Sequence, residues 1–153
     1  MTLPPDSVTF RSATPEDAAH IVHHAHGRGR ATAQDRENYR AWAASALQRG
    51  LYHARFACIN ETVIAGAGVL YFEGGPALGT ASPMRARLVN VFTEPEPRYK
   101  GLSAALCAQV LDHVRACGVQ LVALACTADS RGIYKRLGFK AYPAEMRLLL
   151  PES

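Results

Sequence analysis

The apolar and polar positions at the start of the chain predict one strand followed by one helix. Residues 8–12 alternate apolar and polar side chains, as a half-buried strand does. Thr14 can cap a helix, Pro15 suits its first position, and acidic residues follow directly. We therefore expect a strand over residues 8–12 and a helix over about residues 15–26.

A second amphipathic helix is predicted over residues 35–48. Its apolar side chains recur at helical spacing and form one face, and Gly50 is suited to end it. Tyr39 and Trp42 belong to that face. An aromatic stripe of this kind usually packs into a core, so we interpret both residues as packing residues first and as pocket walls second.

Two β-rich runs follow, over residues 52–60 and 63–72. The short polar connection between them predicts a hairpin. Gly66 and Gly68 inside the second run predict a bulge or a close backbone contact. Residues 73–84 contain glycines and prolines in a cluster and are expected to form a loop.

The second half of the chain has the pattern of a strand, a helix and another strand. Residues 88–92 form a β-branched apolar run, and an apolar-periodic helix begins near Leu102 and ends at Gly118. Residues 119–126 are almost entirely apolar, which suits a strand buried on both faces. Such a crossover makes the two strands parallel neighbours. Residues 145–150 are expected to close the sheet as a final strand.

Length and composition fit one domain over residues 1–153. The chain is 48% hydrophobic and carries a formal net charge of +4. No apolar run approaches the roughly 20 residues of a membrane helix, and residues 1–7 lack the pattern of a signal peptide, so a soluble, cytoplasmic protein is expected. The mild positive charge suits an anionic ligand. The cysteines lack metal-ligand spacing and are expected to be reduced and buried: Cys58, Cys107, Cys117 and Cys126.

The segment from residue 88 to residue 106 predicts an anion-binding site. A strand runs through a proline-rich corner into a helix, and the first N–H groups of a helix point outward with the positive end of its dipole. Gly101 lets the backbone approach a phosphate closely, and Arg98 and Lys100 add positive charge.

This segment resembles the acyl-CoA-binding motif of the GCN5-related N-acetyltransferases (GNAT). That motif is Arg or Gln, two residues, Gly, one residue, and Gly or Ala; Arg98, Gly101 and Ser103 stand at those positions. The serine departs from the pattern but is small, and its hydroxyl can cap the helix or contact a phosphate. Residues 127–139 resemble the family's later signature, a short helix with a tyrosine followed by Leu-Gly-Phe. The resemblance covers roughly residues 8–150.

The resemblance implies a fold and a donor substrate. The expected fold is α/β, a single-domain acyl-CoA N-acyltransferase fold. Its twisted, mostly antiparallel mixed sheet has a splayed parallel central strand pair and helices on both faces. The donor is acetyl-CoA, used as a co-substrate, and no metal is expected. The residues implied to bind acetyl-CoA are Phe92, Thr93, Arg98, Tyr99, Lys100, Gly101, Leu102, Ser103 and Ser130.

The resemblance also implies that Tyr134 is catalytic, as the acid that protonates the departing thiolate. Composition alone would make it a core aromatic residue. Candidate acceptor-site residues are His23, His24 and Asn90; Asn90 can instead satisfy a neighbouring backbone group, and the histidines can be a solvated helix end. The general base stays open among Glu73, Glu94, Asp129, His23, His24 and a water chain.

The sequence therefore predicts an N-acetyltransferase that transfers an acetyl group to a primary amine of a small molecule or peptide by direct attack on the thioester. The alternative is a non-catalytic acyl-CoA-binding sensor or regulatory module, although such a protein has no use for an acid at the sulfur. A nucleic-acid-binding domain is disfavoured because the arginines are dispersed. Zinc at His20 and His24 is disfavoured because no further ligand stands at a suitable spacing. A membrane partner is not expected, and a homodimer is possible.

Overall fold

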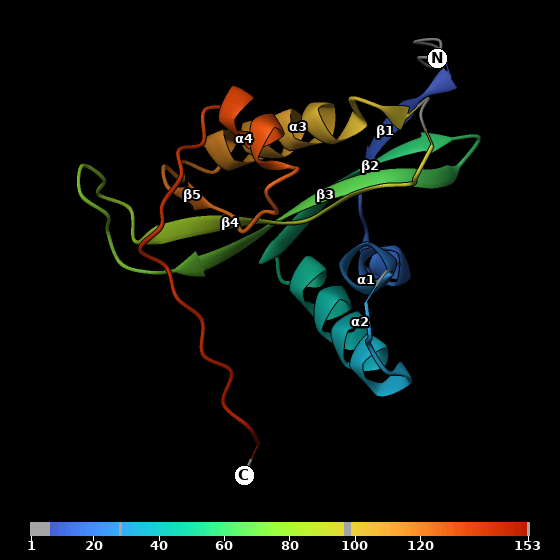
Figure 1. Ribbon diagram of the computed structural model, residues 1–153, viewed down its shortest axis with the longest axis horizontal. Coiled ribbons are helices and arrows are strands. Elements are labelled where there is room, and N and C mark those ends of the chain that lie inside the picture. Colours follow the sequence, from blue (N-terminus) through green and yellow to red (C-terminus); the bar gives the residue numbers. More distant parts are fainter. Residues whose placement is uncertain (1–6, 28, 97–98, 153) are drawn as a thin grey trace.

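A mixed five-stranded sheet with helices on both faces forms the body of the protein (Figure 1). The computed structural model describes residues 7–27, 29–96 and 99–152. The strands lie in the order β1-β2-β3-β4-β5; neighbours are antiparallel except for β4 and β5, which are parallel. Their bounds are β1 Thr9–Ser12, β2 Tyr52–Ile59, β3 Thr62–Glu73, β4 Met84–Thr93 and β5 Val122–Ala123.

The helices form one layer on each face of this sheet. The first layer holds α1 (Ala18–His26), which the short 3-10 helix η2 (Pro15–Asp17) precedes, and α2 (Ala33–Gln48). The second layer holds α3 (Leu102–Ala116) and α4 (Arg131–Arg136). Each layer buries its own apolar cluster against the sheet. The predicted α/β fold class is therefore confirmed.

The start of the first helix is fixed by the side chain of Asp17. Its carboxylate accepts hydrogen bonds from the backbone N–H of Thr14 at 2.8 Å and from the Arg11 guanidinium at 2.7 and 2.8 Å. The guanidinium lowers the pKa of this carboxyl to about 2. Arg11 of β1 thus fixes the start of the helix that the capping signals in the sequence predicted.

The hairpin and the bulge are confirmed. Asn60 and Glu61 both have positive φ, 47° and 68°, as a two-residue hairpin turn requires. The register between β3 and β4 shifts opposite Gly66 and Gly68, but the extra residue of the bulge lies in β4, between Val89 and Phe92, where Asn90 has a φ of 54°. Both glycines also permit a close contact. A Cβ atom at Gly66 would lie 2.6 Å from the His24 ring, and one at Gly68 would lie 2.5 Å from the Tyr52 hydroxyl.

The crossover from β4 through α3 to β5 is confirmed, but the predicted strand over residues 119–126 is mostly wrong. Ala86 pairs with Val122 and Arg87 with Ala123, in parallel. Among the described residues β5 has no neighbour on its other side. Burial therefore alternates between intermediate and exposed along residues 121–126, and the run is not buried on both faces.

The final strand predicted over residues 145–150 is also wrong. After a turn at residues 143–144, these residues form neither helix nor strand, and Figure 1 shows the segment running away from the sheet. Its apolar composition suits a strand, but no strand of the described chain pairs with it. Without such a partner, the leucine side chains stay in solvent.

The cysteines are only partly as expected. All four are free thiols; Cys58 and Cys107 are buried, whereas Cys117 is exposed and Cys126 is half-buried. Cys117 is exposed because it follows the last residue of α3, where the chain turns at the surface. Among the described residues, no helix combines the length and apolar character that crossing a membrane requires.

Candidate active site

The corner between β4 and α3 has the geometry of an anion site. Gly101 is the N-cap of α3 and has a φ of 91°, a conformation that glycine adopts most readily. Among the described residues, a Cβ atom at Gly101 would meet no atom within 4 Å. Ser103, in the first turn of α3, shares a hydrogen bond of 2.7 Å with the Thr93 hydroxyl at the end of β4. The residues present therefore fit a phosphate-bearing ligand.

The other residues of this corner that were predicted to bind acetyl-CoA differ in burial. Lys100 is exposed and Leu102 is half-buried at the start of α3. The Tyr99 side chain is buried in the core beneath α3, so it offers only its backbone to a ligand. Arg98 lies outside the described residues.

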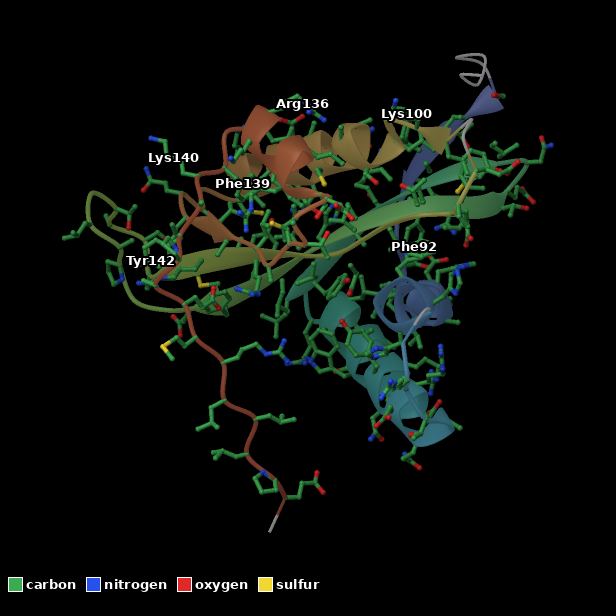
Figure 2. The ribbon with its side chains drawn as sticks, viewed as in Figure 1. Phe92, Lys100, Arg136, Phe139, Lys140 and Tyr142 are labelled. Atoms are coloured by element: carbon green, nitrogen blue, oxygen red, sulfur yellow. The ribbon has the colours of Figure 1, made fainter. Side chains whose placement is uncertain are left out.

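The structure brings together two of the candidate general bases, His23 and Glu94. The Nε2 atom of His23, near the end of α1, lies 2.8 Å from a carboxylate oxygen of Glu94, one residue beyond β4. The His23 ring also packs edge-on against Phe92, with ring centroids 5.0 Å apart. The His23 side chain is 49% exposed, so it can exchange protons with solvent. Figure 2 shows Phe92 between β4 and α1.

His24 has a different environment from its neighbour. Its ring stacks on Phe92, nearly parallel, and meets Phe56 edge-on. Burial, with smaller contributions from His23 and His20, lowers the pKa of His24 to about 4. His24 is therefore neutral at neutral pH and is held in an aromatic contact, which suits packing.

Asn90 links β4 to the first helical layer. Its amide nitrogen donates hydrogen bonds to the hydroxyls of Tyr39 at 2.9 Å and Tyr52 at 2.7 Å. The partners of this amide are therefore side-chain hydroxyls. Asn90 and Phe92 contact the same helical layer, as strand alternation predicted, although the extra residue of the bulge lies in β4 between Val89 and Phe92.

Tyr134 lies in α4 and is 8% exposed. Its ring packs edge-on against Phe139 with centroids 6.0 Å apart. Burial, with contributions from Cys107 and Cys126, raises the pKa of Tyr134 to about 12, so the phenol is protonated at neutral pH. At the start of α4, Ser130 directs its hydroxyl to Thr127, whose hydroxyl oxygen lies at 3.0 Å.

A cavity of about 680 Å³ opens beside the first helical layer. It is lined by Tyr39 and Trp42, and Trp42 is 37% exposed, so these aromatic residues are pocket walls as much as packing residues. Sequence reasoning missed the polar residues that share this wall, because nothing in their spacing along the chain marks them. They are His26, Arg30, Asp35 and Asn38.

The candidate general bases Glu73 and Asp129 do not lie near the pair formed by His23 and Glu94. Glu73 is the last residue of β3, at the end of the strand away from Ala65, which pairs with Thr93. Asp129 is exposed in the turn before α4. Within residues 7–27, 29–96 and 99–152, no three His, Cys, Asp or Glu side chains are placed to hold a metal ion.

Comparisons with known proteins agree with this geometry. The model of the acetyltransferase (GNAT) family matches residues 17–139. No curated protein matches the chain.

Solved structures share the fold at low sequence identity. A predicted acetyltransferase with acetyl-CoA from Clostridium acetobutylicum is 18% identical, with 93% of this chain and 96% of that chain covered and a TM-score of 0.83. A GCN5-related N-acetyltransferase from Ralstonia eutropha JMP134 is 19% identical, with coverage of 93% and 98% and a TM-score of 0.83. Glucosamine-6-phosphate N-acetyltransferase from Arabidopsis thaliana is 13% identical, with coverage of 94% and 99% and a TM-score of 0.71. The family match, with the fold in support, shows that this chain belongs to the acetyltransferase (GNAT) family and is an N-acetyltransferase.

Proposed function

We propose that this N-acetyltransferase transfers the acetyl group of acetyl-CoA to a primary amine by direct attack on the thioester. The main support for this proposal is the end of β4, which lies between a candidate phosphate site and a candidate general base. Thr93 contacts the start of α3, where a phosphate fits, and Phe92 contacts the exposed His23, which pairs with Glu94. An anion-binding corner and a proton acceptor thus flank one strand end.

His23 is the proposed general base. Histidine is the side chain most often used for this role, and among the described candidates His23 combines exposure with an orienting carboxylate. Glu94 is a positioning residue: it holds the imidazole through Nε2 and stabilises the imidazolium that forms when His23 takes a proton from the substrate ammonium. The free amine then attacks the acetyl carbonyl.

Tyr134 is the proposed general acid. As the tetrahedral intermediate collapses, the carbon–sulfur bond breaks and the phenol gives its proton to the departing sulfur. The amide nitrogen releases its surplus proton to solvent, and solvent restores the phenol. Burial keeps the phenol protonated until the thiolate forms. One proton is released overall, and the products are the acetamide and the free thiol.

The cavity beside α1 and α2 is the proposed acceptor site. Its Tyr39 and Trp42 rings give an apolar wall, and the exposed Asp35 carboxylate attracts an ammonium group. Asn90 does not line the cavity, but its amide donates a hydrogen bond to the Tyr39 hydroxyl and so positions this wall of the site. Structural neighbours named as aminoglycoside, glucosamine-6-phosphate and ribosomal-protein-alanine acetyltransferases support an amine acceptor but differ in its chemical class.

The test is calorimetric titration with acetyl-CoA, followed by thiol release with a panel of amines. The panel covers peptide N-termini, lysine, polyamines, aminoglycosides and amino sugars. Binding in the micromolar range and release with one amine class are expected. Absence of acetyl-CoA binding would contradict the proposal, and binding without release across the panel would favour the non-catalytic alternative.

A further inference from the structure

The cavity beside α1 and α2 offers more hydrogen-bond donors than acceptors to a ligand. Among the described residues that line it, donors come from Arg30, Asn38 and Tyr39, whereas Asp35 supplies the one carboxylate. A site recognises a ligand whose polar groups complement its own, because a donor that loses water without gaining an acceptor costs binding energy. The excess of donors therefore points to a substrate with an oxygen-rich, anionic group.

Arg30 supplies the positive charge of this cavity. It lies in the exposed segment just before Thr32, the residue that caps α2. No described carboxylate lies within ion-pair distance of its guanidinium. A guanidinium carries five N–H donors, stays charged, and matches the two oxygens of a carboxylate or phosphate. Arg30 can therefore bind such a group without breaking an ion pair that it already makes.

Two neutral side chains of α2 add donors to the same cavity. The amide oxygen of Asn38 accepts a hydrogen bond from Gln34 at 2.8 Å, which leaves the NH2 group of Asn38 for a ligand. The Tyr39 hydroxyl accepts a hydrogen bond from Asn90 at 2.9 Å, so its own proton remains to be donated. Both side chains can therefore donate hydrogen bonds to the oxygen atoms of a bound anion.

Asp35 opposes Arg30 in charge, but one of its two oxygens is already engaged. That oxygen accepts the backbone N–H of Thr32 at 2.8 Å, as part of the capping box of α2. The other oxygen remains for the ammonium group of a substrate. One guanidinium and one carboxylate around the start of α2 match a zwitterion better than a dication, because a second ammonium group would meet the charge of Arg30.

The cavity follows one face of α2 from its charged start to an aromatic end. Asp35, Tyr39 and Trp42 stand at i, i+4 and i+7 on this face, and seven residues of helix span about 10 Å. His26, on the opposite wall, follows the proposed base His23 by three residues, or about 5 Å along α1. A small amine can therefore place its anionic group at the start of α2 and its nitrogen toward His23.

We propose that the acceptor is a primary amine that also carries a carboxylate or phosphate group, and that Arg30 is the residue that selects it. The guanidinium binds the anionic group, and Asp35 attracts the ammonium before His23 takes its proton. This inference rests on the proposed function, because it takes the cavity as the acceptor site. It excludes polyamines and simple alkylamines as the preferred substrates.

Matched pairs of amines that differ in one anionic group test this selection. The carboxylate pair is phenylalanine and phenylalaninamide, and the phosphate pair is glucosamine 6-phosphate and glucosamine. In Arg30→Gln, the ratio of kcat/KM for the anionic member over the neutral member should fall about tenfold, chiefly through KM. Comparing this ratio between variant and wild type cancels differences in amine reactivity. Arg40→Gln should keep the wild-type ratio, because Arg40 is exposed on the same helix but pairs with Glu37 and does not line the cavity.

The pair that responds identifies the anionic group. A fall in the carboxylate pair assigns an amino carboxylate, and a fall in the phosphate pair assigns an amino phosphate. A ratio that Arg30→Gln leaves unchanged in both pairs would overturn the proposal. A polyamine that the wild type acetylates with a higher kcat/KM than all four compounds would overturn it as well.

Calorimetry separates a failure of this proposal from a failure of acetyl transfer. N-acetylphenylalanine and N-acetylglucosamine 6-phosphate keep the anionic group but have no amine to acetylate. One of them should bind the wild type in the presence of CoA, and Arg30→Gln should weaken that binding about tenfold. Such binding without thiol release from any amine would refute the proposed activity and leave the anion selection standing. Thiol release that does not depend on Arg30, with binding of neither compound, would do the reverse.

Discussion

His23 and His24 are adjacent in the sequence but have opposite environments. Both contact Phe92, yet His23 is exposed and pairs with Glu94, whereas His24 stacks flat on the ring in a largely buried position. The sequence could nominate both histidines but could not separate them. Their separation depends on the rotation of α1 over β4, which is set by tertiary packing.

Tyr134→Phe should lower turnover about a hundredfold or more while leaving the affinity for acetyl-CoA nearly unchanged. The substitution removes the proposed proton donor but keeps the ring that packs on Phe139. Steady-state thiol release and calorimetry measure the two quantities. Tyr142→Phe is the control, because Tyr142 is 79% exposed and loses the same hydroxyl. A collapse of affinity together with lower stability would make Tyr134 a packing residue alone.

His23→Ala should lower turnover by a comparable factor, and added imidazole should restore part of it. The His23 side chain is 49% exposed, so a free imidazole can reach the space that it vacates beside Glu94. A purely structural role would give no rescue. His20→Ala, on the same helix and packed on Phe56, should keep its turnover and show no response to imidazole. Unchanged turnover in His23→Ala would exclude His23 as the base.

At the scale of elements, the sequence predicted correctly the features that depend on a few neighbouring residues. The capped first helix, the hairpin and the close contacts at Gly66 and Gly68 were all found, because caps, turns and close contacts are encoded in a few adjacent residues. Residues 119–126 and 145–150 were misjudged for a different reason. An apolar run shows that burial is favoured, but not which surface provides it.

Gly101→Glu should weaken acetyl-CoA binding by about a hundredfold or more, because like charges brought together cost several kcal/mol. The glutamate would enter the space before α3, where we propose that the phosphates of the donor bind. Gly118→Glu is a matched control at the other end of α3. It also has a positive φ, 74° against 91°, and open space around its Cβ, so it carries similar backbone strain away from the ligand. Equal calorimetric affinities in the two variants would remove the anion site from this corner.

The stacked His24 should make folding stability depend on pH. Its folded pKa of about 4 lies below the unfolded value near 6.5, so the folded state disfavours protonation. The stability that this contributes is fully present above about pH 6.5 and is lost as the pH falls toward 4, by at most about 3 kcal/mol.

Urea unfolding at pH 7 and pH 4 measures this loss. His24→Gln should lose less stability between the two pH values than the wild type, by up to that amount. His26→Gln, at the end of the same helix, should lose as much as the wild type. The groups common to all three proteins titrate alike and cancel. An identical pH dependence in His24→Gln would show that folding leaves the pKa of His24 unchanged, so that the stack on Phe92 does not hold the ring in its neutral form.

At the scale of the whole molecule, each layer of helices has its own task. The α3 and α4 layer holds the proposed anion site and Tyr134, and the α1 and α2 layer holds His23 and the proposed acceptor cavity. The end of β4 contacts both layers, through Thr93 and Phe92. The sequence motif nominated the residues of the α3 and α4 layer. On the other face the sequence nominated His23, Asn90 and Glu94 but not their contacts, because residues from α1, α2 and β4 meet there only after folding.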